Sequence, residues 1–413
     1  MSHINVEDKK IDQSDHSLSY NFRKVIISQT ISMIGDSFSG LALTWFIVQT
    51  GNPMQVGLNL ALAFIPSVVL APFIGSIVDK VSRKFLLWMA DLIRLLLDLI
   101  LIIFVLKGYF TIQIIYIYSF LKAVARIFYL PAQTSIIQQL TNLHNRTKAN
   151  AYQDFFSRIS MVVGPILAGI SVKYFPMELV LGIDAATFLL SAIIIISIQI
   201  DESKIMAQGR KSRYLQHISE GLSYVKKHRW ILLLSFAFAF VNGGNALANV
   251  ARPFLVSEVF QLEADAFGVM NSFASIGAIV SAAILIKHKP KGKNLKYVIN
   301  SILIWGLGVV ILSIADTFII AVLIQVVAFS MGSIMSINAN VFYQNEIPPS
   351  YMGRVYAIRN LISSLAMPVG FLFGDLVIRN FGISNSFIVS GMIIILGAGF
   401  ALIAAKIHEQ SIM

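Results

Sequence analysis

Long apolar segments, each long enough to cross a lipid bilayer, constrain this chain more than any other feature. A membrane-spanning helix needs about 20 mostly apolar residues, because it must cross about 30 Å at 1.5 Å per residue. Of the 413 residues, 56% are hydrophobic and only 13% are charged. An average soluble domain carries about 25% charged residues. The chain is therefore predicted to be an integral membrane protein with the lipid bilayer as its surroundings.

The apolar segments predict helices and not strands. Runs such as residues 95–97 and 193–196 are apolar without interruption, whereas the strands of a transmembrane barrel alternate apolar and polar residues. The sequence predicts an all-α protein with about twelve transmembrane helices. The predicted spans are approximately residues 22–49, 54–78, 85–106, 110–138, 149–174, 178–199, 230–256, 264–286, 297–315, 318–343, 355–379 and 383–405.

The distribution of Lys and Arg predicts the orientation. Most of the 32 basic residues fall in alternate loops, on the side of both termini, and cytoplasmic loops carry such an excess. The net charge of +11 is thus a membrane-orientation signal, and binding to nucleic acid is not expected. The opposite loops and their edges hold Lys107, Lys173, Arg252 and Arg379. We expect a multi-pass protein of a bacterial cytoplasmic membrane, with both termini in the cytoplasm and no cleaved signal peptide.

The spans divide into two similar halves on either side of a polar linker. Tyr214–Lys227 has apolar residues at helical spacing, which favours an amphipathic helix at the membrane surface. Equal numbers of spans give the halves the same orientation, and transporters built from such parallel repeats bind substrate at the midplane between them. The predicted regions are a tail 1–21, a six-helix bundle 22–200, the linker 201–229, a second bundle 230–406 and a tail 407–413.

Ionisable residues inside the spans are the first candidates for function, because buried charge in a membrane is costly and usually functional. Asp36 lies about 21 Å along its helix, near the centre of the bilayer. Arg126 and Arg158 also fall near mid-span, and we expect these three side chains to meet in a central cavity. Protonation of Asp36 would then couple transport to the proton gradient, with Arg126 as its partner. The alternative is a static ion pair that holds helices together.

Two further sets of charges have helical spacing. Asp91, Arg94 and Asp98 share one stripe of the third span; we interpret Asp91 and Arg94 as a structural pair and the deeper Asp98 as a proton-coupling candidate. Asp154 and Arg158 are four residues apart, so they can form an ion pair with each other. Both are also candidates for lining the cavity.

The expected cavity has a basic side in the first half and an amide-rich side in the second. Lys122 lies one turn before Arg126, and two adjacent cations would attract an anionic group. The second half offers amides such as Asn242 and Asn245. The candidate cavity and substrate residues are Lys122, Arg126, Asp154, Arg158, Asn242 and Asn245.

The loop after the second span carries a recognisable motif. Gly75, Asp79 and Arg83 occur with the spacing Gly-x-x-x-Asp-Lys-x-Ser-Arg-Lys, which resembles the loop signature of the major facilitator superfamily. In that superfamily the loop acts as a latch, so the resemblance implies that Gly75, Asp79 and Arg83 are gating residues. Helix ends near Arg354 and Arg359 are the expected partners. Ser82 stands where the signature has glycine.

A second motif narrows the resemblance. Gly164, Pro165 and Gly169 match the antiporter motif of the superfamily's exporters, with Ser160 and Ala168 replacing two glycines. Small residues there let two helices pack closely. Arg126 occupies the position of the superfamily's basic motif, which is linked to proton transfer. Residues 34–36, 91–94 and 351–355 look like the macrolide-efflux branch, which includes siderophore exporters.

We therefore expect a proton-coupled antiporter that exports an amphipathic drug or a siderophore-like metabolite by alternating access. It would need no cofactor besides the proton gradient and no metal, and we expect it to be a monomer. An uptake symporter or a facilitator is the alternative within the same fold. A receptor or scaffold would require a large folded domain outside the membrane, and an enzyme would require a catalytic set; neither is visible in the sequence.

Overall fold

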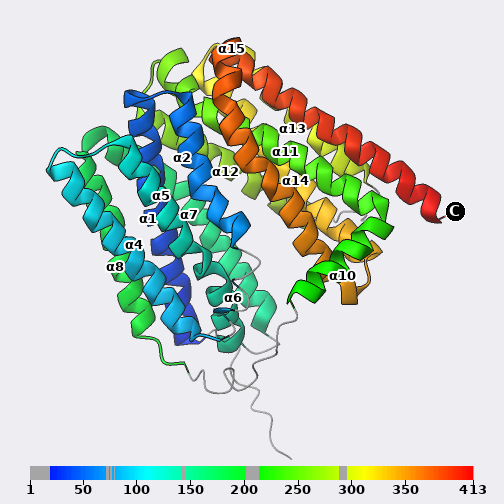
Figure 1. Ribbon diagram of the computed structural model, residues 1–413, viewed down its shortest axis with the longest axis horizontal. Coiled ribbons are helices and arrows are strands. Elements are labelled where there is room, and N and C mark those ends of the chain that lie inside the picture. The colour runs from blue at the N-terminus through cyan, green and yellow to red at the C-terminus, as the bar shows by residue number, and fades with distance from the viewer. Residues whose placement is uncertain are drawn as a thin grey trace, which may run out of the picture.

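The structure is a computed structural model of an all-helical protein that describes residues 19–70, 74, 77–78, 80–141, 145–200, 214–287 and 295–412. Its first half forms one group of helices, on the left of Figure 1. These helices are α1 (Tyr20–Thr50), α2 (Pro53–Val69), α4 (Arg83–Leu106), α5 (Ile112–Ile127), α6 (Tyr129–Leu140), α7 (Arg146–Tyr174) and α8 (Met177–Ile196).

The second half forms the other group, joined to the first through the region that contains α10 (Tyr214–Lys227). Its elements are α11 (Arg229–Phe254), η2 (Leu255–Val259), α12 (Ala264–Lys287), α13 (Lys296–Ile311), η3 (Leu312–Ile314), α14 (Phe318–Glu346) and α15 (Pro349–Ile412). The chain reverses inside α15 at Gly382, whose φ of 81° is in the left-handed region that favours glycine. α15 therefore contains the last two predicted spans.

The observed helices confirm the predicted fold class. Within the described residues, nine helices are long and apolar enough to cross a membrane by length and composition, and α15 is one of them. α2 is shorter than these, and α4 carries three charged residues at its centre, Asp91, Arg94 and Asp98. The predicted fourth span differs: it is made of α5 and α6, which meet at Phe128.

Local signals explain where several helices begin. The Ser19 and Ser82 side chains accept hydrogen bonds from backbone N–H groups at the starts of α1 and α4. Asn52 and Gln55 form a reciprocal capping box before α2, with Pro53 as its first residue. Such caps satisfy N–H groups that have no partner within the helix.

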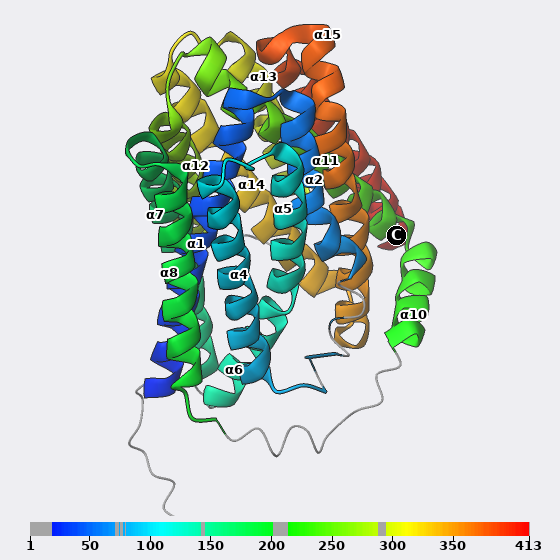
Figure 2. The same ribbon diagram turned by 60° about the vertical axis from the view of Figure 1, so that its left-hand side comes forward.

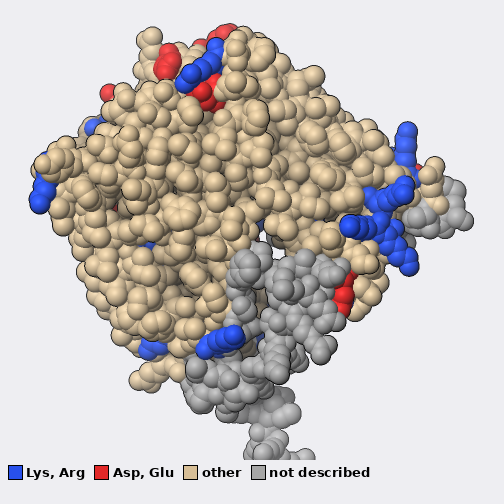
Figure 3. Space-filling view, in the orientation of Figure 1, with Lys and Arg blue, Asp and Glu red and all other residues tan. Residues whose placement is uncertain are grey.

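The outer surface has the pattern expected of a membrane protein. A broad belt with few charged side chains crosses the face shown in Figure 3, and the charged side chains gather mainly at its margins. Many large apolar side chains point outward, for example Leu99, Ile103 and Ile193, each at least 44% exposed. In water this surface would be an aggregation liability, whereas lipid tails solvate it.

We call the end of the bundle where α1 begins, α10 lies and α15 ends the linker end, and the opposite end the far end. The two halves pack together closely toward the far end. Backbone of Phe371 in α15 contacts Gly57 of α2, so close that a Cβ at Gly57 would lie 2.3 Å from its oxygen. Lys173 of α7 pairs with Glu263 and Asp265 at 3.2 and 2.9 Å. Figure 2 also shows α2 beside α11 and α15.

The helix α10 docks on the start of α15 at the linker end. Arg354 pairs with Glu220 at 2.9 Å, and the rings of Tyr224 and Tyr351 stack with centroids 4.4 Å apart. The predicted amphipathic helix therefore exists, and its contacts tie the linker to the second half.

The contact between α7 and α12 gives the first prediction. A Cβ at Gly268 would lie 2.2 Å from the backbone oxygen of Pro165, so Gly268→Ala must push two helix backbones apart. We expect the free energy of unfolding to fall by about 1–3 kcal/mol, as for other overpacked sites. Thermal unfolding of the purified protein in detergent would measure the change.

The control is Gly182→Ala in α8, where a Cβ would meet nothing within 4 Å. This substitution of alanine for glycine within a helix should leave the free energy of unfolding unchanged or raise it slightly. Equal stability of the two variants would show that the α7–α12 approach is not tight.

Candidate functional site

Four helices of the first half each present a polar stripe toward one another. On α4 the stripe is Asp91, Arg94 and Asp98, three and four residues apart, so all three lie on one helix face. The other stripes are Ser32, Asp36 and Ser39 on α1, Tyr118, Lys122 and Arg126 on α5, and Asp184, Phe188 and Ser191 on α8. Their side chains meet inside the bundle as one network, which we call the charged cluster.

Arg94 organises one part of the charged cluster. Its Nη1 lies 3.3 Å from Asp36 Oδ2, and its Nη2 donates a short hydrogen bond to Asp91. Asp91 also accepts hydrogen bonds from Ser32 at 3.3 Å and Ser191 at 2.5 Å. Asp91 therefore has two neutral donors besides Arg94, whereas the partners of Asp36 among the described residues are the cations Arg94 and Arg126.

Lys122 organises the other part. Its Nζ lies 2.6 Å from Asp184 Oδ2 and 3.3 Å from Asp98 Oδ1, and all three groups are buried. Nζ also contacts the Ser39 hydroxyl at 2.7 Å, and Tyr118 donates a short hydrogen bond to Asp98. The second oxygens of Asp98 and Asp184 have no hydrogen-bond partner among the described residues.

The ring of Phe188 joins the two parts. The guanidinium of Arg94 lies 4.3 Å from the ring centroid and the ammonium of Lys122 lies 4.6 Å from it. The negative face of an aromatic ring attracts a cation, and the attraction is stronger where water is excluded. Phe188 thus lets two cations lie near each other in the core.

The charges of the cluster do not balance. Within the part of the chain that the structure describes, four carboxylates (Asp36, Asp91, Asp98 and Asp184) are within ion-pair distance of only three cations, Arg94, Lys122 and Arg126. With every group ionised the cluster carries one net negative charge, which a single bound proton would neutralise.

One edge of the charged cluster opens on a cavity of about 150 Å³. Asp36 lines this cavity and is 14% exposed, and Arg126 lies 3.6 Å from it and is 61% exposed. Thr44, Asn59 and Ser119 add polar groups to the wall. Asp36 is therefore the carboxylate of the charged cluster that lines this cavity.

A second cavity, of about 290 Å³, lies between the two halves. Its walls come from α1, α7, α11, α12 and α14, so both halves contribute. The lining residues are Ser37, Met161, Pro165, Asn245, Asn249, Arg252, Asn271, Ala274, Ser275 and Phe329. We call it the central cavity.

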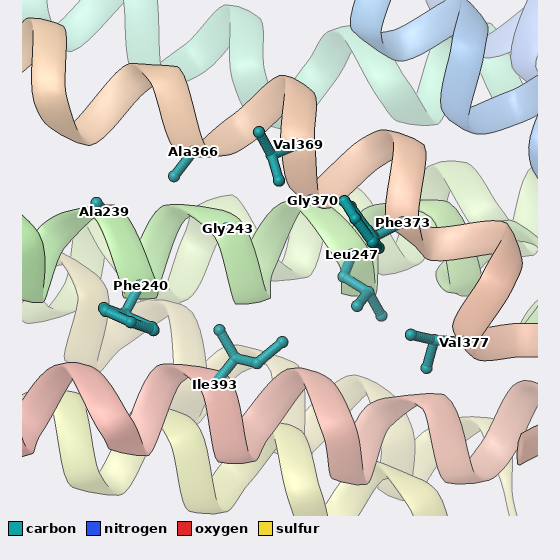
Figure 4. Close-up of a pocket in the computed structure, with 10 residues that line it drawn as sticks. All are labelled: Ala239, Phe240, Gly243, Leu247, Ala366, Val369, Gly370, Phe373, Val377 and Ile393. Atoms are coloured by element: carbon teal, nitrogen blue, oxygen red, sulfur yellow. The ribbon is translucent and has the colours of Figure 1, made fainter.

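A third cavity is a groove of about 320 Å³ between α11 and the two segments of α15, lined only by apolar residues. Figure 4 shows Phe240, Leu247 and Ile393 pointing into it. Phe373 is 56% exposed at its rim. Without a polar group to orient a ligand, this groove fits lipid tails better than a substrate.

The structure brings together only part of the predicted central set. Asp36, Arg126, Lys122 and Asp98 all belong to the charged cluster. Arg158 does not reach it, because its Nε pairs with Asp154 one turn earlier at 2.7 Å, and Asp154 is 63% exposed. The expectation that Asp36, Arg126 and Arg158 meet was wrong for Arg158.

The predicted amides of the second half have separate surroundings. Asn245 lines the central cavity, while the side chain of Asn242 donates to the backbone oxygen of Ser363 at 3.0 Å and links α11 to α15. Asn245 thus remains a cavity residue, and Asn242 has a packing contact.

The two motifs are described to different extents. Gly75 and Asp79 lie outside the described residues, and Arg83 is buried at the start of α4. Arg354, an expected latch partner, pairs with Glu220 of α10. In the antiporter motif, Gly169 packs against the backbone of Ala264 in α12, a contact between the halves.

The rest of that motif also lies at helix contacts. Gly164 packs against Ser37 of α1, and the Pro165 backbone lies against Gly268. The close packing expected of this segment is therefore present on both of its sides.

Sequence reasoning missed three residues of these sites. Asp184 and Tyr118 were not among the candidates, although both contact the candidate Lys122 and Tyr118 lies one helical turn before it. Arg252 was assigned to the edge of an outer loop. Because α11 continues into η2 as far as Val259, Arg252 is buried inside the bundle, only 3% exposed.

A buried charged network and a cavity between two helical halves are features that a membrane transporter uses. Residues 25–371 match the family model of the Major Facilitator Superfamily. The chain belongs to this superfamily, and it is a transporter.

Named relatives are similar over nearly the whole chain. Macrolide efflux protein A of Streptococcus pyogenes is 24% identical over 396 residues, which cover 94% of this chain and 96% of that protein. The staphyloferrin A transporter of Staphylococcus aureus is 23% identical over 371 residues, covering 88% and 91%.

Solved structures share the fold at low identity. The nucleoside transporter NupG has a TM-score of 0.72 at 14% identity, covering 94% of this chain and 98% of its own. A bacterial homologue of the iron transporter ferroportin, in an inward-facing state, has a TM-score of 0.73 at 13% identity, with coverage of 94% and 99%. These matches establish the architecture alone.

The charged cluster gives the second prediction. Lys122→Met would leave Asp98 and Asp184 buried without their shared cation, so we expect a loss of about 3–5 kcal/mol in stability. Adding Asp98→Asn and Asp184→Asn removes both charges and should restore much of the loss. Thermal unfolding in detergent, with the yield of monodisperse protein, would measure both effects.

Arg158→Met is the matched control, because it also removes one cation from a membrane helix. Its partner Asp154 is exposed, so the loss should stay within about 1 kcal/mol. Similar losses for Arg158→Met and Lys122→Met would contradict the structural role of the cluster.

Proposed function

We propose that this chain is a proton-coupled exporter that moves a small amphipathic molecule, a drug or a siderophore-like metabolite, by alternating access. The observation that carries the proposal is the charged cluster, with one carboxylate more than its cations and with Asp36 at the edge of a cavity. Buried ionisable groups are expensive in a membrane and are usually kept for function.

Asp36 is suited to report the side of the membrane to which its cavity opens. When ionised it attracts both Arg94 and Arg126, which hold α4 and α5 against α1. A proton on Asp36 removes the charge that attracts them. Arg126, the more exposed of the two cations, would then be released, and the contact between α1 and α5 would loosen. Asp98 is the deeper carboxylate on which the proton could reside.

The arrangement of the halves fits one state of such a cycle. The contacts of α2 with α15 and of α7 with α12 close the far end, and the central cavity lies between the halves. If the basic linker end faces the cytoplasm, as the positive-inside pattern predicts, this state is inward-facing and ready to take up cargo from inside.

One relative supports export as the direction, because it is named macrolide efflux protein A and matches over nearly the full chain. The staphyloferrin A transporter, whose name gives no direction, supports a small metabolite as the cargo. The antiporter motif, which packs α7 against α1 and α12, agrees with this direction.

The third prediction tests coupling. Inverted membrane vesicles with an imposed proton gradient should release protons when erythromycin or staphyloferrin A is added as probe substrate. Asp36→Asn cannot lose or gain the proton, so we expect gradient-driven transport to fall at least about tenfold, a barrier effect of about 1.4 kcal/mol or more. A pH-sensitive dye and uptake of labelled probe would measure it.

The control is Asp154→Asn, which also neutralises one carboxylate of a membrane helix but at an exposed position. It should transport like the unmodified chain. Undiminished gradient-driven transport by Asp36→Asn would overturn the coupling assignment. Accumulation with the gradient reversed would instead favour the uptake symporter.

A further inference from the structure

Arg252 is a buried cation without an acidic partner. It is 3% exposed on α11, and among the described residues no carboxylate lies within ion-pair distance of it. Two other buried cations, Arg94 and Lys122, each contact two carboxylates. An uncompensated buried charge is strongly unfavourable, so its presence requires an explanation.

Neutral groups hold the guanidinium in place. Nη2 donates to Asn245 Oδ1 at 2.9 Å and Nη1 donates a short hydrogen bond to Asn249 Oδ1. The ring of Phe329 lies 5.1 Å from the guanidinium carbon. Arg252 therefore points back along α11 toward its amino end, as long helical side chains do. Its Nε has no hydrogen-bond partner in the described part of the chain.

The guanidinium faces the central cavity, whose other lining residues are all uncharged. Because Asn245 and Asn249 use their oxygens to hold Arg252, their NH2 groups remain available as donors, and neither donates to another described residue. Ser37, Asn271 and Ser275 add further polar groups to the wall. The cavity thus combines a fixed positive charge with several donors and with the apolar Phe329, Met161 and Ala274.

We propose that the central cavity binds the carboxylate of an anionic amphipathic substrate, with Arg252 as its charge partner and Asn245 and Asn249 as additional donors. The inference names the substrate class for the transport cavity and rests on the proposed function. A planar guanidinium matches the geometry of a carboxylate. One cation balances the single charge of a carboxylate, whereas a phosphate group carries about two charges at neutral pH.

This site differs from the basic set expected from the sequence. Lys122, Arg126 and Arg158 were expected to attract an anion, but each is paired with at least one carboxylate of its own half. Among the residues that line the central cavity, the one positive charge belongs to the second half, on α11.

The test compares two probes of nearly the same size and shape, the anion 1-naphthylacetate and its neutral amide, 1-naphthylacetamide. Full-length protein in detergent, with no proton gradient, should bind the acetate at least about tenfold more tightly than the amide, because a charge-assisted pair is lost with the amide. Arg252→Gln should reduce the acetate-to-amide affinity ratio to about one. Arg252→Lys, which keeps the charge but not the planar fork, should retain part of the preference.

Arg158→Gln is the matched control and should keep the full preference, because Arg158 is paired with Asp154 outside the cavity. Circular dichroism and thermal unfolding of each variant would show that it is folded. Equal or absent binding of both probes by the unmodified chain, or a preference that survives in Arg252→Gln, would overturn the proposal. Since binding is measured without a gradient, a failed coupling assay would contradict the proposed function without changing this result.

Discussion

The pairing of the Lys122 ammonium with two buried carboxylates is the interaction on which the first half of the protein depends. Asp98 comes from α4, Asp184 from α8 and Lys122 from α5, so three helices are fixed by one set of charges. Phe188 and Arg94 extend the set to α1 through Asp36. Lipid offers no water to solvate such groups, and removing Lys122 leaves two buried carboxylates without their shared cation.

The two halves divide the chemistry between them. The first half concentrates acids and bases in the charged cluster, and the second half holds one cation, Arg252, among amides in the central cavity. α1 belongs to both sites, because Asp36 lines the smaller cavity and its neighbour Ser37 lines the central one. A movement of α1 on protonation of Asp36 would therefore change the wall of the central cavity directly.

Much of the fold could be predicted because helix length and apolar composition are local properties. The span starting near residue 22 matches α1, and the amphipathic segment matches α10. Side-chain partners could not be predicted in the same way: Arg158 pairs within its own helix, while Asp184 contacts a lysine 62 positions earlier in the chain. Arg252 was misplaced because its neighbours looked like a helix end, although the helix continues through η2.

The central claim is that the charged cluster binds one proton and that Asp36 is where it exchanges. Infrared difference spectroscopy of the protein in lipid, between mildly acidic and alkaline pH, measures protonated carboxyl groups directly and needs no substrate. We expect one titrating carboxyl band that is absent in Asp36→Asn and retained in Asp154→Asn. A band unaffected by Asp36→Asn, or no titrating carboxyl in the accessible pH range, would contradict the account.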